Sequence, residues 1–363
     1  MRVDPTRLNR RALLAAPIAL VACDRLAVAE PAPVPLAPPL KAIAPCPFGA
    51  TGMTWQLDQP DWIAQILRHC SQLTPEWEQK MERTLGPGFV HDFSASDRVV
   101  AFARDNGLRV HGHTLIWYSQ GGDVFNDSVP PARFAAEYDR YITDFVSRYR
   151  GQMAGWDVVN EPVAEDGNGL RDSHWSRALG AEGYMVRAFQ QAHAADPNAV
   201  LFLNEYNLEN IPAKGATFLK LVERLLKLGA PIGGIGTQSH LDIEIPASQI
   251  RAFFRDAASL GLPIHVSELD FPLKRDGGRM PDLRPTSERR VQQAARVGEL
   301  AEAFMALPER QRYAFTTWGL RDTDSWLLRE DRAKSGDSPL LLDAEGRPNP
   351  AYQALVDAFS RTP

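Results

Sequence analysis

The chain is poor in the features that mark several common classes of protein. Its 363 residues carry 40 basic and 45 acidic side chains, a net charge of −5, whereas a nucleic-acid-binding face is strongly basic. Only three cysteines are present, and no group of Cys and His has the spacing of a zinc site. No glycine-rich fingerprint of the dinucleotide or P-loop type follows the first predicted strand. We therefore expect no nucleic-acid partner, no metal and no cofactor.

A hydrophobic run long enough to cross a bilayer is also missing at the N-terminus. The apolar stretch Ala12–Ala22 is too short for a membrane span, and it follows Arg10 and Arg11, as in an export signal. The sequence Leu20-Val21-Ala22-Cys23 resembles the bacterial lipobox, in which the cysteine is lipidated after cleavage, and the paired arginines weakly resemble a twin-arginine signal. We predict a signal peptide over residues 1–23 with a lipid anchor at Cys23; ordinary signal cleavage is the alternative.

Export implies a periplasmic or membrane-anchored protein, with secretion as the alternative. Residues 24–47 are rich in Pro and Ala, a composition typical of an extended linker, so we place them outside the fold. Beyond Cys23, the remaining cysteines are Cys46 and Cys70, which precede the first two predicted strands. Because the spacing of two cysteines does not determine their pairing, a disulfide and two free thiols both remain open.

From Phe48 onward, short apolar stretches alternate with longer amphipathic ones. This alternation indicates parallel strands joined by helical crossovers. Eight such units fit an α/β fold of the (β/α)₈ TIM-barrel type, one catalytic domain over residues 48–361, better than a doubly wound sheet. We expect a monomer. The predicted strands are Phe48–Thr51, Ser71–Thr74, Leu108–Leu115, Gly155–Asn160, Ala199–Asn204, Ile232–Gln238, Pro263–Leu269 and Tyr313–Trp318.

Polar residues gather at the C-terminal ends of these strands. In a TIM barrel the C-terminal ends converge on one face, where active sites are built. The fourth and seventh strands end in the carboxylates Glu161 and Glu268. Two carboxylates facing each other are the requirement for cleaving a glycosidic bond, since one protonates the leaving oxygen while the other attacks the sugar or activates water. The pattern therefore predicts a glycoside hydrolase. Other polar or aromatic strand ends are His113, Asn160, Asn204, Glu205, Gln238, His240 and Trp318.

With these residues in place, the chain resembles glycoside hydrolase family 10, whose best-known members are endo-β-1,4-xylanases. The resemblance runs from about Phe48 to Phe359, and its most specific motifs are Gly112–Trp117, Trp156–Pro162 and Ser267–Asp270. It implies a retaining mechanism in which Glu161 is the acid/base and Glu268 the nucleophile. It also implies supporting roles: His240 and Asp270 tune the charge of the nucleophile, and Asn160 bonds the sugar 2-hydroxyl.

The resemblance further implies the residues that bind the glycone sugars. They are Glu76, Lys80, His113, Trp117, Gln238, Trp318 and Trp326. Three positions depart from the family pattern: Trp77 stands where Asn is usual, Tyr118 replaces a His, and Glu205 replaces an Asp. We include Trp77 among the binding residues, either stacked on sugar or packed on its neighbours. Its presence puts plain xylan in doubt as the substrate.

The leading hypothesis is thus a retaining endo-β-1,4-xylanase whose partner is a β-linked xylose polysaccharide or oligosaccharide. A related alternative is a retaining β-glycosidase for short, decorated or non-xylan oligosaccharides. A non-catalytic oligosaccharide-binding lipoprotein is a third reading, although a binder needs no proton donor beside a nucleophile. A barrel enzyme for phosphorylated metabolites is disfavoured, since no Gly-rich phosphate site follows the seventh or eighth strand.

Overall fold

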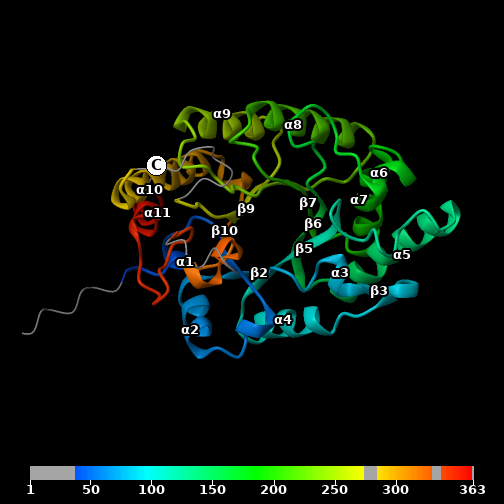
Figure 1. Cartoon of the computed structure of the whole chain (residues 1–363), viewed down its shortest axis with the longest axis horizontal. Coiled ribbons are helices and arrows are strands. Elements are labelled where there is room, and N and C mark those ends of the chain that lie inside the picture. The colour runs from blue at the N-terminus through cyan, green and yellow to red at the C-terminus, as the bar shows by residue number, and fades with distance from the viewer. Residues whose placement is uncertain (1–36, 274–283, 329–336, 362–363) are drawn as a thin grey trace, which may run out of the picture. The chain divides into compact units, whose positions relative to one another are not determined.

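The structure is a computed structural model that describes residues 37–273, 284–328 and 337–361. Parallel strands close into one barrel in the order β1-β10-β9-β8-β7-β6-β5-β2, with helices around them (Figure 1). The (β/α)₈ prediction is confirmed, and each predicted strand is present. The barrel strands are β1 (Phe48–Gly52), β2 (Gln72–Pro75), β5 (Arg109–Trp117), β6 (Met153–Asn160), β7 (Val200–Glu205), β8 (Gly234–Thr237), β9 (Ile264–Leu269) and β10 (Arg312–Thr317); β3 (Leu85–Gly86) and β4 (Val90–His91) form a separate antiparallel pair.

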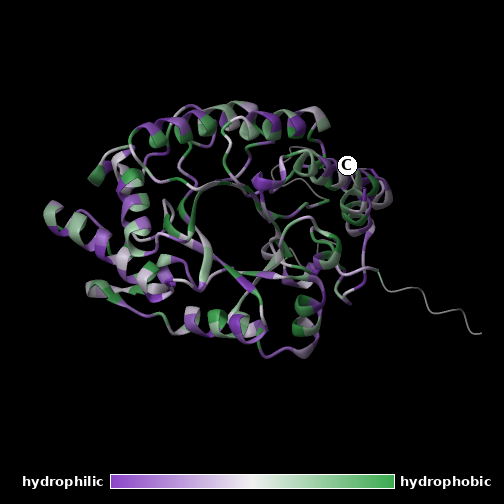
Figure 2. Ribbon diagram, turned by 180° about the vertical axis from the view of Figure 1, so that it is seen from behind, coloured by the Kyte–Doolittle hydropathy of each residue, from purple (hydrophilic) through white to green (hydrophobic). Residues whose placement is uncertain are grey.

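The helices carry hydrophobic and hydrophilic residues in alternation, as Figure 2 shows. In α5 (Pro131–Arg148) the buried residues Phe134, Tyr138, Tyr141 and Phe145 recur every three or four positions, which places them on one face. Proline occupies the first turn of α5 and also of α2 (Pro60–His69), α8 (Pro212–Lys227) and α11 (Pro350–Ser360), where its missing N–H is no loss. The other α-helices of the described residues are α1 (Leu40–Ile43), α3 (Met81–Thr84), α4 (Ser94–Asp105), α6 (His174–Leu179), α7 (Gly183–Ala195), α9 (Ala247–Ala258) and α10 (Thr286–Met305).

Two strands that carry the site approach each other closely through a glycine. A Cβ atom added at Gly112 in β5 would lie 2.2 Å from the indole of Trp156 in β6. Trp156 is fully buried and packs against Phe145 of α5. The glycine therefore lets the Trp156 ring fill the space between barrel and helix layer while β5 and β6 stay paired.

The predicted linker needs a correction at its C-terminal part. Residues 1–36, with the predicted signal peptide and Cys23, lie outside the described residues. Residues 37–47, however, pack against the barrel: Leu40 is fully buried, and the Tyr352 hydroxyl donates to the carbonyl of Pro38. Composition suggested a tether, but a buried leucine and these backbone contacts join the segment to the folded unit.

Two smaller questions from the sequence are answered within the described part of the chain. Cys46 and Cys70 are free thiols, and burial raises the pKa of Cys46 to about 12. Of the two alternatives, the structure therefore has free cysteines. Among the described residues, none of the helices combines the length and apolarity that crossing a membrane requires.

Candidate active site

A cavity of about 350 Å³ opens at the C-terminal ends of the barrel strands. Every predicted site residue except Asp270 lines it, and Asp270 lies directly behind His240. Tyr206, which was not predicted, also lines the cavity. The lining residues are Glu76, Trp77, Lys80, His113, Trp117, Asn160, Glu161, Tyr206, Gln238, His240, Glu268, Trp318 and Trp326.

Glu161 directly follows β6 and has a left-handed backbone, with φ of 59°. Its carboxylate accepts three hydrogen bonds: Trp117 Nε1 donates to Oε2 at 2.7 Å, while Gln238 Nε2 and Asn160 Nδ2 donate to Oε1 at 3.1 Å and 3.3 Å. The side chain is only 8% exposed. Glu161 is thus held with one defined orientation at the cavity wall.

Glu268 lies in β9, across the barrel from Glu161. Asn204 Nδ2 donates to its Oε1 at 2.7 Å and also to Asn160 Oδ1 at 2.9 Å. Gln238 Nε2 donates both to Asn160 Oδ1 and to Glu161 Oε1, each at 3.1 Å. The two carboxylates are therefore joined through a continuous chain of side-chain amides, which fixes one relative to the other.

His240 and Asp270 form an ion pair beside Glu268. His240 Nδ1 lies 2.8 Å from Asp270 Oδ1, and its Nε2 lies 3.4 Å from Glu268 Oε2. Burial by itself disfavours the imidazolium, but the charges and hydrogen bonds of Asp270 and Glu268 raise the pKa of His240 to about 10. Trp326 Nε1 completes the group by donating to Asp270 Oδ2 at 2.8 Å. A positive His240 thus faces the carboxylate of Glu268 at neutral pH.

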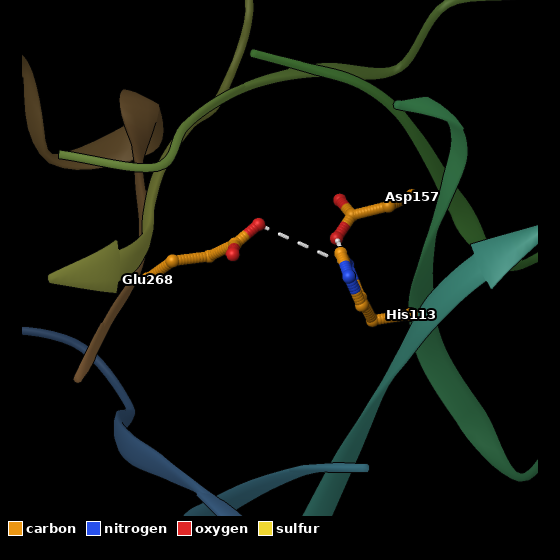
Figure 3. Close-up of side chains that lie close together, drawn as sticks. All are labelled: His113, Asp157 and Glu268. Carbon is orange, nitrogen blue, oxygen red and sulfur yellow. Dashed lines mark hydrogen bonds and ion pairs between the residues drawn. The ribbon is translucent and has the colours of Figure 1, made fainter. Parts of the chain in front are cut away.

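A second histidine approaches Glu268 from β5, as Figure 3 shows. His113 Nδ1 lies 2.8 Å from Asp157 Oδ2 and 3.9 Å from Glu268 Oε1. Burial opposes ionisation of Asp157, but His111 and His113 outweigh it and hold the pKa of that carboxyl well below its usual range.

The same three side chains, His113, Asp157 and Glu268, are close enough together to suggest a metal centre. A metal ligand must offer a lone pair, yet His113 Nδ1 donates its proton to the ionised Asp157. The geometry therefore fits a hydrogen-bonded histidine better than a metal ligand.

Lys80 also lines the cavity and lies among three indole rings. Its Nζ lies 5.0 Å from the ring centroids of Trp77 and Trp117 and 5.7 Å from that of Trp318. Burial lowers the pKa of Lys80, against the opposing charges of Glu268, Glu76 and Glu161. Trp77 is 37% exposed: its ring packs on Lys80 and also lines the cavity, so stacking on sugar remains a prediction.

Several residues of the site were not predicted from the sequence, because they lie inside strands or next to a predicted residue. Asp157 and His111 sit within β6 and β5, where we expected apolar packing, and they hydrogen-bond to each other at 3.0 Å. An aspartate in the middle of a run as apolar as Trp156–Val159 was the available signal. Tyr206 follows Asn204 and Glu205, and nothing in its own pattern distinguishes it from a core tyrosine.

Comparison with known proteins gives a consistent result. The family model described as glycosyl hydrolase family 10 matches residues 41–358. Endo-1,4-beta-xylanase C of Paenibacillus barcinonensis is 37% identical over 324 residues, covering 83% of this chain and 30% of that protein. Endo-1,4-beta-xylanase A of Cellvibrio japonicus is 36% identical over 313 residues, covering 80% and 50%. The chain thus spans half or less of these two relatives.

A shorter relative and a solved structure match over nearly their whole length. Endo-1,4-beta-xylanase B of Paenibacillus barcinonensis is 35% identical over 300 residues, covering 80% of this chain and 89% of that protein. The crystal structure of xylanase XynB from the same organism, complexed with a conduramine derivative, superposes with a TM-score of 0.81 at 32% identity and covers 88% of this chain and 98% of that one.

Proposed function

The chain belongs to glycosyl hydrolase family 10, and from this premise we propose that it is a retaining endo-β-1,4-xylanase acting on xylan or xylo-oligosaccharides. The observation that carries the proposal is the pair Glu161 and Glu268, held on facing strand ends and joined by the amides of Asn160, Asn204 and Gln238. The xylanases among its relatives support the choice of sugar.

In the first step, Glu268 attacks the anomeric carbon while Glu161 transfers its proton to the glycosidic oxygen. The bond to the leaving sugar breaks, and an ester between Glu268 and the remaining sugar forms. His240 is positively charged and 3.4 Å from Glu268, so it favours the ionised carboxylate that this attack requires.

In the second step, Glu161 has lost its proton and acts as the base. It removes a proton from a water molecule, whose oxygen attacks the anomeric carbon and releases Glu268 as carboxylate. Two inversions restore the original anomeric configuration. Trp117 and Gln238 keep Glu161 in place through both steps, since each donates to one of its two oxygens.

Sugar release from xylan and xylotetraose by the wild type and by Glu268→Ala tests the proposal. We expect release by the wild type and a loss of more than about 10⁴-fold in kcat in the variant, because the variant lacks the carboxylate that forms the ester. An unchanged rate in Glu268→Ala would remove Glu268 from the mechanism. Turnover of any glycoside also excludes the hypothesis that the protein is a non-catalytic sugar-binding lipoprotein.

The second candidate function, a β-glycosidase for short, decorated or non-xylan oligosaccharides, rests on Trp77. Its indole lies at the cavity rim against Lys80, where the family pattern has an amide that can bond sugar hydroxyls. An indole offers a stacking face instead and is less selective for hydroxyl positions. Activity on an aryl xylobioside compared with an aryl cellobioside distinguishes the two candidates.

We also propose, from the sequence pattern alone, that the enzyme is exported and anchored through Cys23. Metabolic labelling with a radioactive fatty acid should mark the wild type and leave Cys23→Ser unlabelled. Equal labelling of both, or of neither, contradicts the anchor. A monomer in solution is the accompanying expectation, which sedimentation of the folded domain checks.

A further inference from the structure

The backbone of Glu161 has a conformation that few residues other than glycine adopt. Its φ of 59° lies in the left-handed region, and Pro162 follows it, although a residue before proline favours extended backbone. Asn207 and Ser239, after β7 and β8, also have positive φ, of 59° and 55°. Such a turn persists only where the surrounding structure holds it.

Two side chains hold the turn on either side of Glu161. Arg171 Nε donates to the carbonyl oxygen of Glu161 at 3.1 Å, and Arg171 N donates to the carbonyl of Pro162 at 2.7 Å. On the other side, the backbone N–H of Val163 donates to Glu205 Oε2 at 2.9 Å. The three-residue segment Glu161–Val163 is thus fixed by one guanidinium and one carboxylate.

Glu205 is itself fixed by a buried cation. Its Oε1 lies 3.0 Å from Lys214 Nζ at the start of α8, and neither side chain is exposed to solvent. Lys214 Nζ also lies 3.4 Å from the ring centroid of Tyr206, whose backbone N–H donates to Glu205 Oε1 at 3.0 Å. Burial raises the pKa of Glu205, whereas the charge of Lys214 lowers it and so favours the ionised carboxylate.

The helix α8 also contacts the segment that follows the turn. A Cβ at Gly167 would lie 2.6 Å from Lys214 N, and Thr217 Oγ1 donates to the carbonyl of Gly167 at 2.7 Å. The loop after β6 therefore rests on the first turns of α8, with the Lys214–Glu205 pair between them.

We propose that the buried Glu205–Lys214 ion pair is a positioning device for Glu161, holding the turn after β6 so that the carboxyl group of Glu161 faces the scissile oxygen. Neither residue lines the cavity, so both act through the backbone of Glu161–Val163. The inference rests on the proposed acid/base role of Glu161.

The consequence of neutralising Glu205 follows from its three partners. The backbone N–H groups of Val163 and Tyr206 donate to its carboxylate, and Lys214 Nζ lies 3.0 Å from it. In Glu205→Gln one oxygen becomes an amide NH₂, which cannot accept from a donor, and the buried Lys214 loses the carboxylate that lies 3.0 Å from its Nζ. The turn loses its restraint on the Val163 side. Glu205→Asp keeps the charge and should keep most of the restraint.

Two substrates separate misplacement of the acid from general damage. Xylotetraose has a sugar alcohol as leaving group and needs a proton, whereas dinitrophenyl xylobioside releases a phenolate that needs none. In Glu205→Gln we expect kcat/KM to fall about 100-fold for xylotetraose and to stay near the wild-type value for dinitrophenyl xylobioside. Glu205→Asp should stay close to wild type on both. The second step still needs Glu161 as base, so kcat on the dinitrophenyl substrate should fall in Glu205→Gln, and azide, which attacks the ester without base assistance, should restore it.

The control is Asp139→Asn, which breaks the Asp139–Arg187 pair between α5 and α7, away from the turn. It should lower the melting temperature but leave the ratio of the two kcat/KM values, for xylotetraose and for dinitrophenyl xylobioside, as in the wild type. If kcat/KM of Glu205→Gln falls equally on both substrates, the inference is overturned while the proposed function stays intact. A wild type that is inactive on both substrates overturns the proposed function instead.

A crystal structure of Glu205→Gln tests the inference independently of activity. A shifted Glu161 supports it, and an intact Trp117–Glu161 hydrogen bond with the same turn overturns it.

Discussion

At the scale of single residues, the ion pair between His240 and Asp270 makes stability depend on pH. The ordinary pKa of a histidine is 6.5, and in the folded protein Asp270 and Glu268 raise that of His240 to about 10. Because folding raises this pKa, protonation of His240 stabilises the folded state. The contribution to the unfolding free energy is fully present below pH 6.5 and is lost as the pH rises towards 10. Asp270→Asn should therefore cost about 3 kcal/mol in unfolding free energy at pH 6 and progressively less at higher pH.

Urea denaturation of wild type and variant between pH 6 and pH 9.5 measures that difference. The matched control is Asp97→Asn, which breaks a pair with Arg148 on the outer surface. Arginine keeps its charge throughout this range, so the cost of Asp97→Asn should not change with pH. A cost of Asp270→Asn that is equally independent of pH would mean that His240 is not charged in the folded protein.

We predict that Trp77 determines how the glycone end of the cavity recognises sugar. Replacing its indole with alanine removes a stacking face worth about 1 kcal/mol, so KM for an aryl xylobioside should rise between about three- and tenfold with kcat little changed. Trp77→Asn should lower the aryl cellobioside to aryl xylobioside activity ratio, because an amide bonds specific hydroxyls. Trp55→Ala, on an exposed indole outside the cavity lining, is the control. No change in either Trp77 variant would show that the ring only packs on Lys80.

At the scale of elements, the segment before β1 belongs to the folded unit. Leu40 in α1 is fully buried, whereas Lys41 beside it is exposed. Leu40→Ala should cost about 3 kcal/mol in unfolding free energy, from lost burial and the cavity left behind. Lys41→Ala should cost no more than about 0.5 kcal/mol. Denaturant titrations with an unchanged m-value measure the cost of each substitution. Equal small costs would mean that residues 37–47 are part of the linker and not of the folded unit.

That segment also shows what sequence reasoning can and cannot reach. Alternation of apolar strands and amphipathic helices is local, so all of the barrel strands and the polar residues at their ends were predictable. The partner of Pro38 is Tyr352, far along the chain, and no local pattern links them. Likewise, Glu205 was noted as a polar strand end and as a departure from the family, but its pairing with Lys214 was not predictable because it depends on how α8 packs.

At the scale of the whole molecule, the barrel joins side chains from separate strands into one rigid site. The amides of Asn160, Asn204 and Gln238 come from β6, β7 and the end of β8, and they bridge Glu161 and Glu268. A sugar bound between these strand ends contacts several of them at once. Binding should therefore stabilise the entire fold and not a single loop.

This coupling can be measured without turnover in Glu268→Ala. A ligand that binds only the folded state at 100 times its dissociation constant adds about 2.7 kcal/mol to the unfolding free energy. Xylotetraose should produce that increase in denaturant titrations, while α-linked maltotetraose should produce none, because its chain cannot follow a cleft built for β-linkages. An equal increase with cellotetraose would favour the broader β-glycosidase, since the cavity would then not distinguish the two sugars. No increase with either β-linked ligand would mean that the cavity between Glu161 and Trp77 does not bind these oligosaccharides.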